Sequence, residues 1–383
     1  MRGIYLAVIV LLCFTVYGAM GSGKGQQPEH VATVLACDDS QLTVIGSNRI
    51  GMQTLSIELK KHPGKPYSAF NLLTGTLEYD EFYQPGDTIL VAIQFNPNGQ
   101  VHHIKALSHY RLPYLMMLFA LFAIALLAYA RHIGLSALIS FVGSVLIIWQ
   151  LLIPGLVAGY PPMFITTATL IALSALIIFS IAGWTNKGKA AFTGTLIGLM
   201  ITALLCLMCG KLLKLDGMTQ PMAQLLLFET GMHLNMLDVL YAAVLIGASG
   251  AAMDVAMEMA ATMEELKLTN PEMNKKQLLR SGFRVGNAVI GTMTTTLLLA
   301  YSGGFLTLLM LFISRDTSLM QIFNMKLVAS EVARTLMGSL SLVIVAPLTA
   351  WIANSMLFRT QLYDHHVTSS VLTEKLTASC NDK

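Results

Sequence analysis

The segment Gly247–Leu266, GASGAAMDVAMEMAATMEEL, combines the character of a membrane helix with carboxylates. Asp254 and Glu258 are four residues apart, so a helix places them on one face with three small residues, Gly247, Gly250 and Ala251. A carboxylate at membrane depth is costly in free energy and usually faces protein or a water-filled cavity. The segment therefore predicts a transmembrane helix whose polar face is the first place to look for function.

The composition of the whole chain agrees with a membrane protein. Of its 383 residues, 55% are hydrophobic and only 12% are charged, and the mean hydropathy is +0.64. Such long apolar runs are typical of a polytopic α-helical membrane protein. The net charge of +3 is small and no basic cluster is interleaved with aromatic residues, so we expect the lipid bilayer as a partner and no nucleic acid.

The sequence offers no convincing metal or cofactor motif. Cys206 and Cys209 form a CxxC inside an apolar run without a second ligand pair, so they read as small apolar side chains. The 23 methionines are spread along the chain and are more simply core residues than a thioether site. No P-loop, H-E-x-x-H or dinucleotide motif occurs. We therefore expect no metal, no cofactor and no nucleotide-driven step.

The N-terminal part divides into a hydrophobic leader and a β domain. The apolar run Ile4–Tyr17 makes residues 1–21 either a signal peptide or an uncleaved anchor helix. Residues 29–111 alternate polar and apolar side chains and contain turn signals such as Pro85-Gly86-Asp87 and Asn98-Gly99. These patterns predict about six short strands in a small all-β domain, either an OB-like barrel or a sandwich.

Residues 113–357 form the predicted transmembrane helical domain, and residues 359–383 form a polar tail. About eight core spans are expected behind the leader: Pro113–Ala130, Leu135–Ile153, Phe164–Gly183, Ala190–Cys209, Leu237–Met257, Val285–Tyr301, Gly304–Ser314 and Leu336–Leu357. The seventh is too short to cross about 30 Å unaided, so it either continues further or joins the sixth as one bent unit around Gly303-Gly304. Thr219–Phe228 is a further apolar stretch, interfacial or re-entrant.

Lysine and arginine predict the orientation of these spans. With the N-terminus inside, the short external loops hold only Lys211 and Lys214, and all other loop arginines and lysines are cytoplasmic. This asymmetry predicts a protein of the cell (cytoplasmic) membrane whose β domain lies outside the cytoplasm. If the sixth and seventh spans are one helix, Arg315–Arg334 and the tail change sides.

Two later helices carry polar faces that are expected to meet the Asp254 face. The first face contains, at helical spacing, Arg284, Asn287, Gly291, Thr294 and Thr295. The second contains Glu331, Arg334, Thr335, Gly338 and Ser341. Because buried carboxylates seek arginine, the candidate ion pairs are Asp254 or Glu258 with Arg284, and Glu331 with Arg334, the latter also an i,i+3 pair within one helix. The small residues predict close helix packing at Gly247, Gly250, Ala251, Gly291 and Gly338.

A simpler interpretation exists for part of this set. Glu258 and Arg284 can lie solvated at the cytoplasmic interface, as can Glu264 and Glu265. The threonine run Thr294–Thr296 can bond to the backbone of its own helix. Asp254 lies deeper in its span, so we favour a functional role for it.

Signatures of an enzyme are weak. Gly247-Ala248-Ser249-Gly250 has the GxSG form of rhomboid-type serine proteases, but that chemistry needs a histidine base at the same depth. The nearby candidates, His132 and His233, fall in loops or at helix ends. Asp254 lacks a GxGD context and a partner aspartate in another span. The sequence therefore predicts no catalytic residue and no enzyme.

Three motifs in these helices resemble the bacterial YibE/F family of multispan membrane proteins: GAAMDVAMEMAATMEEL (Gly250–Leu266), GTMTTTLLLAY (Gly291–Tyr301) and EVARTLMGSLSLVIVAPLTA (Glu331–Ala350). The resemblance implies about eight membrane helices behind an extracytoplasmic N-terminal domain, and a permease role without a named substrate. Family members often carry a sequence like G-R-D before the GTM motif, where this chain has Gly286-Asn287-Ala288. The resemblance thus implies that this chain lacks a polar pair facing Asp254.

These observations together predict a permease driven by an ion gradient. The expected path for an ion, a proton or a small solute is lined by Asp254, Glu258, Arg284, Asn287, Thr294, Thr295, Glu331 and Arg334. The alternative is a non-transport scaffold or assembly factor of the cell envelope, which binds a partner through the external β domain. A second copy of the chain is also a candidate partner.

Overall fold

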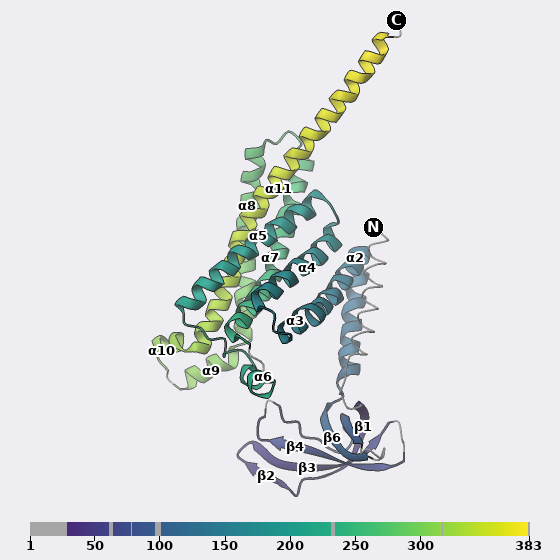
Figure 1. Ribbon diagram of the computed structural model, residues 1–383, viewed down its shortest axis with the longest axis vertical. Coiled ribbons are helices and arrows are strands. Elements are labelled where there is room, and N and C mark those ends of the chain that lie inside the picture. Colours follow the sequence, from purple (N-terminus) through teal and green to yellow (C-terminus); the bar gives the residue numbers. More distant parts are fainter. Residues whose placement is uncertain are drawn as a thin grey trace. The chain divides into compact units, whose positions relative to one another are not determined.

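The computed structural model describes residues 29–60, 64–77, 79–95, 101–230, 234–315 and 317–381. The predicted leader, residues 1–21, lies outside the described residues. The chain forms two compact units, Met1–Arg131 and His132–Lys383 (Figure 1).

The first unit contains the predicted β domain, and it is a barrel rather than a sandwich. Its six strands are β1 (Glu29–Asp38), β2 (Leu42–Ile45), β3 (Asn48–Leu59), β4 (Pro66–Thr74), β5 (Thr88–Phe95) and β6 (Val101–His109). They are ordered β1-β5-β6-β4-β3-β2, and an additional pairing of β1 with β3 closes the five longer strands. All described pairings are antiparallel except that of β4 with β6.

Successive side chains of a strand point to opposite faces, and this alternation explains which residues fill the barrel core. In β3, Leu55, Ile57 and Leu59 point inward and are at most 3% exposed, while the residues between them face outward. Gly51 lies where β3 bends toward β2, with φ of 132°. A Cβ there would lie 2.2 Å from the carbonyl oxygen of Gln41, so only glycine fits.

The first apolar helix follows the barrel directly. Helix α2 (Leu112–Ile147) continues through a π-helical turn, η1 (Ile148–Leu152), into α3 (Ile153–Val157). At Arg131 the backbone is not helical, with φ of 44° and ψ of −113°. The predicted spans Pro113–Ala130 and Leu135–Ile153 fall on either side of this break. Leu112–Val157 contains 46 residues, which would extend about 69 Å at 1.5 Å per residue. This length is enough to cross a bilayer twice.

The rest of the second unit is helical. Its elements are α4 (Pro162–Ala182), α5 (Asn186–Leu212), α6 (Ala223–Thr230), α7 (Met236–Thr269), α8 (Lys275–Gly303), α9 (Leu306–Ser314), α10 (Leu319–Asn324) and α11 (Lys326–Asn381). Polar caps begin three of the long helices: Thr185 accepts from the Gly188 amide, Asn235 from the Leu237 amide, and Asn274 forms a capping box with Gln277. The apolar stretch Thr219–Phe228 contains most of the short helix α6.

The number of long apolar helices is smaller than the eight spans expected. Within the described residues, five helices are long and apolar enough to cross a membrane, and α8 with α9 makes a sixth if this pair is one span. The two are bent by 65° at the break near Gly304, so the predicted seventh span joins the sixth as a bent unit. The first two predicted spans have no loop between them, because the backbone departs from helical dihedral angles only at Arg131.

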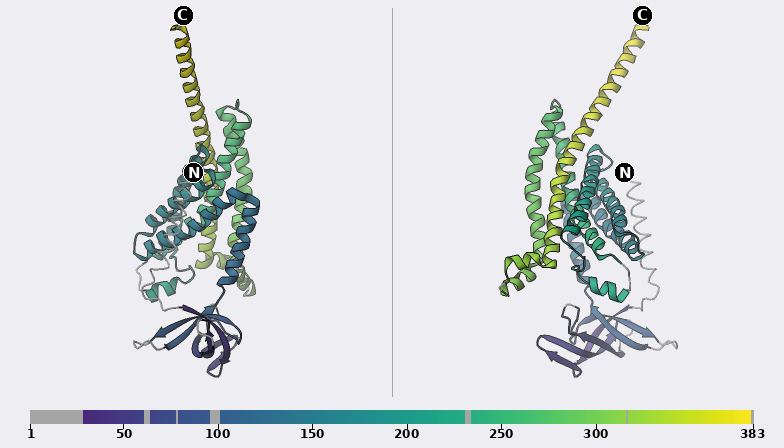
Figure 2. Two further views of the ribbon diagram at one scale, coloured as in Figure 1. Left: turned by 90° about the vertical axis from the view of Figure 1, so that its right-hand side faces the viewer. Right: turned by 60° about the vertical axis from the view of Figure 1, so that its left-hand side comes forward.

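The core of the second unit lies where α5, α7 and α11 pack against one another, with α4 and α8 against α7 (Figure 2). Glycines in α5 allow this close approach. A Cβ on Gly194 would lie 2.2 Å from Oγ1 of Thr349, and one on Gly198 would lie 2.2 Å from a methyl group of Val345. Side chains of α11 therefore pack directly against the backbone of α5, an arrangement that small residues commonly allow in membrane helix bundles.

Candidate functional site

The predicted polar stripe of α7 lies on the exposed side of an otherwise buried helix. Gly247, Gly250, Asp254 and Glu258 are exposed. The opposite side of the helix packs into the core through residues that are at most 3% exposed, including Ala252, Met253, Val255, Ala256 and Met259. The three-to-four spacing read from the sequence therefore separates the core face from the polar face.

Asp254 lies near the middle of α7, a helix of 34 residues or about 51 Å. Its side chain makes no hydrogen bond or ion pair with any described residue. One turn earlier, a Cβ built on Gly250 would have no atom within 4 Å. The carboxylate and the glycine together mark an open surface at the centre of the helix.

The candidate ion pair between α7 and Arg284 is not formed. Within the described part of the chain, neither Asp254 nor Glu258 has a basic group within ion-pair distance, and Arg284 is exposed. The rotation of α8 explains this, because Gly282 and Gly286 face α7, where their Cβ positions would contact Met263 and Met259. Arg284 lies between these two glycines in sequence and therefore points away from α7.

The threonines of α8 bond to their own helix, as one of the two interpretations expected. Thr295 donates to the carbonyl of Gly291 at 3.1 Å, and Thr296 donates to that of Thr292 at 3.0 Å. The buried hydroxyl of Thr294 has no partner among the described residues. Gly291 is exposed with no atom near its Cβ position, like Gly250.

Asn287 lines a groove that is shared by three helices. The groove encloses about 360 Å³ and is bordered by Met259, Phe283, Gly286, Asn287, Ile290, Val343, Ala346 and Pro347. Pro347 lies inside α11 and has no N–H, so the carbonyl of Val343 loses its usual helical donor. The groove thus places the amide side chain of Asn287 beside an interruption in the backbone hydrogen bonding of α11.

Glu331 and Arg334 form the predicted ion pair within α11. Nη2 of Arg334 lies 3.3 Å from Oε1 of Glu331, and the two side chains are only 18% and 10% exposed. Oγ1 of Thr335 donates to the carbonyl of Glu331 at 3.0 Å. Gly338 lies one turn further on, where its Cβ would be 3.4 Å from Leu297 of α8. Of the two candidate pairs, the structure therefore contains the local one.

Sequence reasoning gave no role to Tyr301, although it ends the GTM segment. Its hydroxyl lies 2.6 Å from the Cβ position of Gly247, and its ring lies 3.7 Å from that of Gly338. Tyr301 therefore lies where α7, α8 and α11 meet. In the sequence, Gly247 and Gly338 could have indicated this position, because a stripe of glycines leaves room for one large side chain.

Charged groups near the helix ends pair with each other, as expected for interfacial residues. Lys187 lies 2.9 Å from Glu264, and Lys326 lies 2.6 Å from Asp216. The hydrogen bond from Lys326 lowers the pKa of the Asp216 carboxyl. Glu264, for which a solvated position at the interface was one interpretation, is instead partly buried and paired with Lys187.

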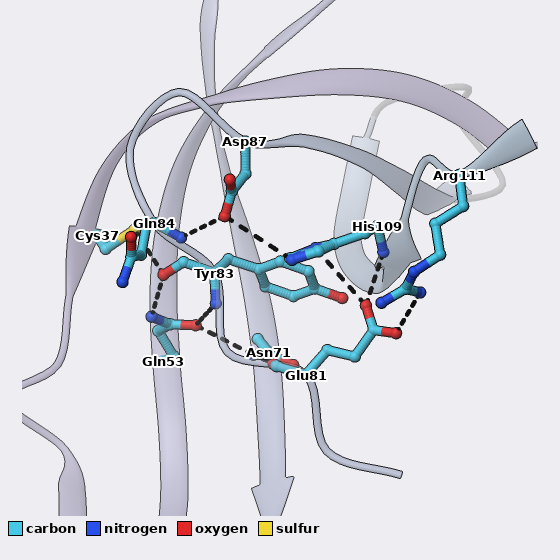
Figure 3. A network of polar contacts seen from close by, with 9 residues as sticks. All are labelled: Cys37, Gln53, Asn71, Glu81, Tyr83, Gln84, Asp87, His109 and Arg111. Carbon is cyan, nitrogen blue, oxygen red and sulfur yellow. Dashed lines mark hydrogen bonds and ion pairs between the residues drawn. The ribbon is translucent and has the colours of Figure 1, made fainter. Parts of the chain in front are cut away.

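A separate polar cluster fastens the loop after β4 to the barrel (Figure 3). Nε2 of the buried Gln53 donates to the carbonyl of Tyr83 at 2.9 Å and to Asp39 at 3.0 Å. Oε1 of Gln53 accepts from Asn71 at 3.1 Å and from the Tyr83 amide at 3.3 Å. All four hydrogen-bonding positions are used within the domain, so Gln53 is a structural residue.

Glu81 holds the end of β6 in the same cluster (Figure 3). Its carboxylate accepts from Nη1 of Arg111 at 2.6 Å and from the His109 amide at 2.7 Å. Burial alone would raise the pKa of Glu81, but these hydrogen bonds and the Arg111 charge outweigh it and lower the pKa. Among the described residues, no three His, Cys, Asp or Glu side chains are grouped to hold a metal ion.

The long apolar helices suggest a membrane protein: among the described residues, five helices are long and apolar enough to cross a membrane, and the N-terminal region forms a β-barrel. A family model described as YibE/F-like protein matches residues 118–359. The match covers more than half of the chain, which therefore belongs to the YibE/F-like family. The matched region begins after the barrel. Searches of curated proteins and of solved structures each found no match.

Proposed function

We propose that the protein is a permease of the cytoplasmic membrane, driven by an ion gradient, in which Asp254 is a proton- or cation-binding group. One observation carries the proposal. Asp254 lies at the centre of a core helix, yet its side chain is exposed and has no partner among the described residues.

The cost of burying charge supports this role. A carboxylate facing lipid near the centre of the bilayer is strongly unfavourable, so such groups usually line a hydrated path or a cavity. The open space beside Gly250 leaves room for water or an ion next to the carboxylate. Asn287 adds a polar side chain at a neighbouring groove. In the proposed path, Glu258, Arg284, Thr294 and Thr295 are accessory polar residues.

The barrel domain is proposed to lie outside the cytoplasm, with the basic loops that precede α8 inside. This assignment rests on the distribution of lysine and arginine. Because α8 and α9 form one bent unit, Arg315–Arg334 are proposed to lie on the same side as the barrel. No enzymatic step is part of the proposal. Ser249, the residue of the GxSG pattern, is 2% exposed and donates to the carbonyl of Ile246 at 2.7 Å, which argues against a nucleophile.

The alternative function, an envelope scaffold, is supported by one feature of the barrel, which we propose to be OB-like. Strand β2 lies at a sheet edge, and its Val44 and Ile45 are 66% and 61% exposed. Exposed apolar edge strands are sites where partners add a strand. Under this alternative, deleting Glu29–Ser108 abolishes function, whereas Asp254→Asn leaves it intact.

The test compares two carboxylates on one face of α7. The full chain is reconstituted in liposomes that contain a pH-sensitive dye, and proton-linked flux is screened over a panel of inorganic ions. Asp254→Asn should abolish the coupled flux. Glu265→Gln, three turns further along the same exposed face, should retain it. Equal flux in wild type and Asp254→Asn would exclude a protonation role for Asp254.

A further inference from the structure

A second cavity lies between α8, α9 and α11, away from Asp254. It encloses about 190 Å³ in the angle of the bent pair α8 and α9. Its lining is almost wholly apolar and includes Leu298, Phe305, Leu309, Val328, Val332 and Leu336. The one ionisable carboxylate in this lining is Glu331, which is 8% exposed.

The polar groups of this pocket divide into satisfied and unsatisfied ones. The hydroxyl of Ser302 donates to the carbonyl of Leu299, and that of Thr335 to the carbonyl of Glu331, so both are used within their helices. Oε1 of Glu331 faces Arg334, but Oε2 is buried without a hydrogen-bond partner among the described residues. Tyr301 also lines the pocket, but its hydroxyl lies against Gly247 of α7. Oε2 of Glu331 is therefore the one carboxylate oxygen of the lining that is left without a donor.

The charge near this acceptor decides what kind of donor suits it. Arg334 already compensates the charge of Glu331, and Nε and Nη2 of Arg334 are themselves buried without hydrogen bonds. A second cation would therefore meet a neutral pair with spare N–H donors. A neutral O–H group fits better, because it satisfies Oε2 without adding charge.

We propose that this pocket binds a small hydrophobic compound with one neutral hydroxyl, such as a phenol or a short alcohol, whose O–H donates to Oε2 of Glu331. The size supports a free small molecule over a lipid, because an apolar cavity of about 150 Å³ accommodates benzene. Glu331 lies five residues after the start of α11, near the membrane interface where amphipathic molecules concentrate. The proposal does not depend on transport.

The first test uses two probes that differ in one group, 4-fluorophenol and 4-fluorotoluene. Saturable binding to the full chain in lipid nanodiscs is measured by fluorine NMR, and partition into empty nanodiscs is subtracted. The phenol should bind about tenfold more tightly, since only it supplies the missing donor. Equal affinities in the native chain would overturn the proposal without any variant.

Variants then locate the binding. The double variant Glu331→Leu/Arg334→Leu removes both charges together and should bind the two probes equally; a preserved preference for the phenol would contradict the role of Glu331. Val332→Phe fills the pocket and should abolish both interactions. Val343→Phe makes the same change on α11 at the Asn287 groove and should leave them intact; a loss there with retention in Val332→Phe would place the site elsewhere.

A last arm separates a free alcohol from a lipid hydroxyl. Hexanol should displace 4-fluorophenol, whereas dioleoylglycerol added to the nanodiscs should leave it bound. Displacement by dioleoylglycerol and not by hexanol would assign the pocket to a lipid and overturn the small-molecule proposal.

Discussion

The hydroxyl of Tyr301 lies 2.6 Å from the position that a Cβ atom would take on Gly247. Real Cβ atoms do not approach other atoms so closely, so this contact between α8 and α7 requires glycine at position 247. The ring of the same tyrosine also lies 3.7 Å from the Cβ position of Gly338 in α11. Two stripes of small residues therefore meet on one aromatic side chain.

Gly247→Ala is expected to destabilise this meeting point. The added methyl group must displace the Tyr301 hydroxyl, at a cost of about 1–3 kcal/mol typical of overpacking. Gly250→Ala, where the added atom meets nothing, should be neutral or slightly stabilising. Thermal unfolding in detergent measures both. Adding Tyr301→Phe should restore much of the stability of Gly247→Ala, and the absence of any rescue would disprove the contact.

The buried ion pair of Glu331 and Arg334 in α11 predicts that mutations of the two residues change the free energy of unfolding non-additively. Arg334→Leu alone leaves Glu331 charged and buried, which should destabilise the fold by about 3–5 kcal/mol. Replacing both residues by leucine should restore most of that loss, because no uncompensated charge remains. A double-mutant cycle of unfolding free energies provides the measurement. Strictly additive losses would mean that the two side chains do not interact.

The lowered pKa of Glu81 predicts how the barrel responds to acid. A carboxyl whose folded pKa lies below its unfolded value stabilises the fold above the unfolded pKa, ordinarily about 4.5. That contribution is lost as the pH falls through the lower, folded value. The protection of residues 79–87 against hydrogen exchange, measured relative to the intrinsic exchange rate at each pH, should therefore decrease below about pH 4.5 in the full chain.

Glu81→Gln should show faster exchange of this segment already at pH 7, with a weaker dependence on acid. Glu29→Gln, at the start of β1, is the matched control and should behave as wild type. Unchanged protection in Glu81→Gln would mean that its contacts with Arg111 and His109 do not hold the loop.

Local patterns could be read from the sequence because they depend on neighbours in the chain. The alternation after Pro85-Gly86-Asp87 gave the strands now seen as β5 and β6, and the spacing of Asp254 and Glu258 gave their shared, exposed face. The parallel pairing of β4 with β6 could not be read in this way, since it joins segments that are far apart in the chain. The barrel was therefore expected only as one of two alternatives.

The partners of polar side chains were harder to predict, because they depend on how each helix is rotated. Arg284 was expected to meet the α7 carboxylates, but the packing of Gly282 against Met263 turns it outward. Glu331 and Arg334 were predictable because they share one helix at i,i+3 spacing. The helix break at Arg131 involves no glycine or proline, so the sequence carried no local signal for it.

The central claim is that Asp254 faces water in the middle of the membrane, and cysteine accessibility tests it most directly. In a chain whose native cysteines are replaced by alanine, Asp254→Cys, Ala256→Cys and Glu265→Cys are treated with a charged, membrane-impermeant methanethiosulfonate. Ala256 is fully buried, and Glu265 lies exposed near the helix end. The account predicts that the cysteines at 254 and 265 react while the one at 256 does not. A cysteine at 254 as inert as that at 256, with 265 reactive, would contradict it.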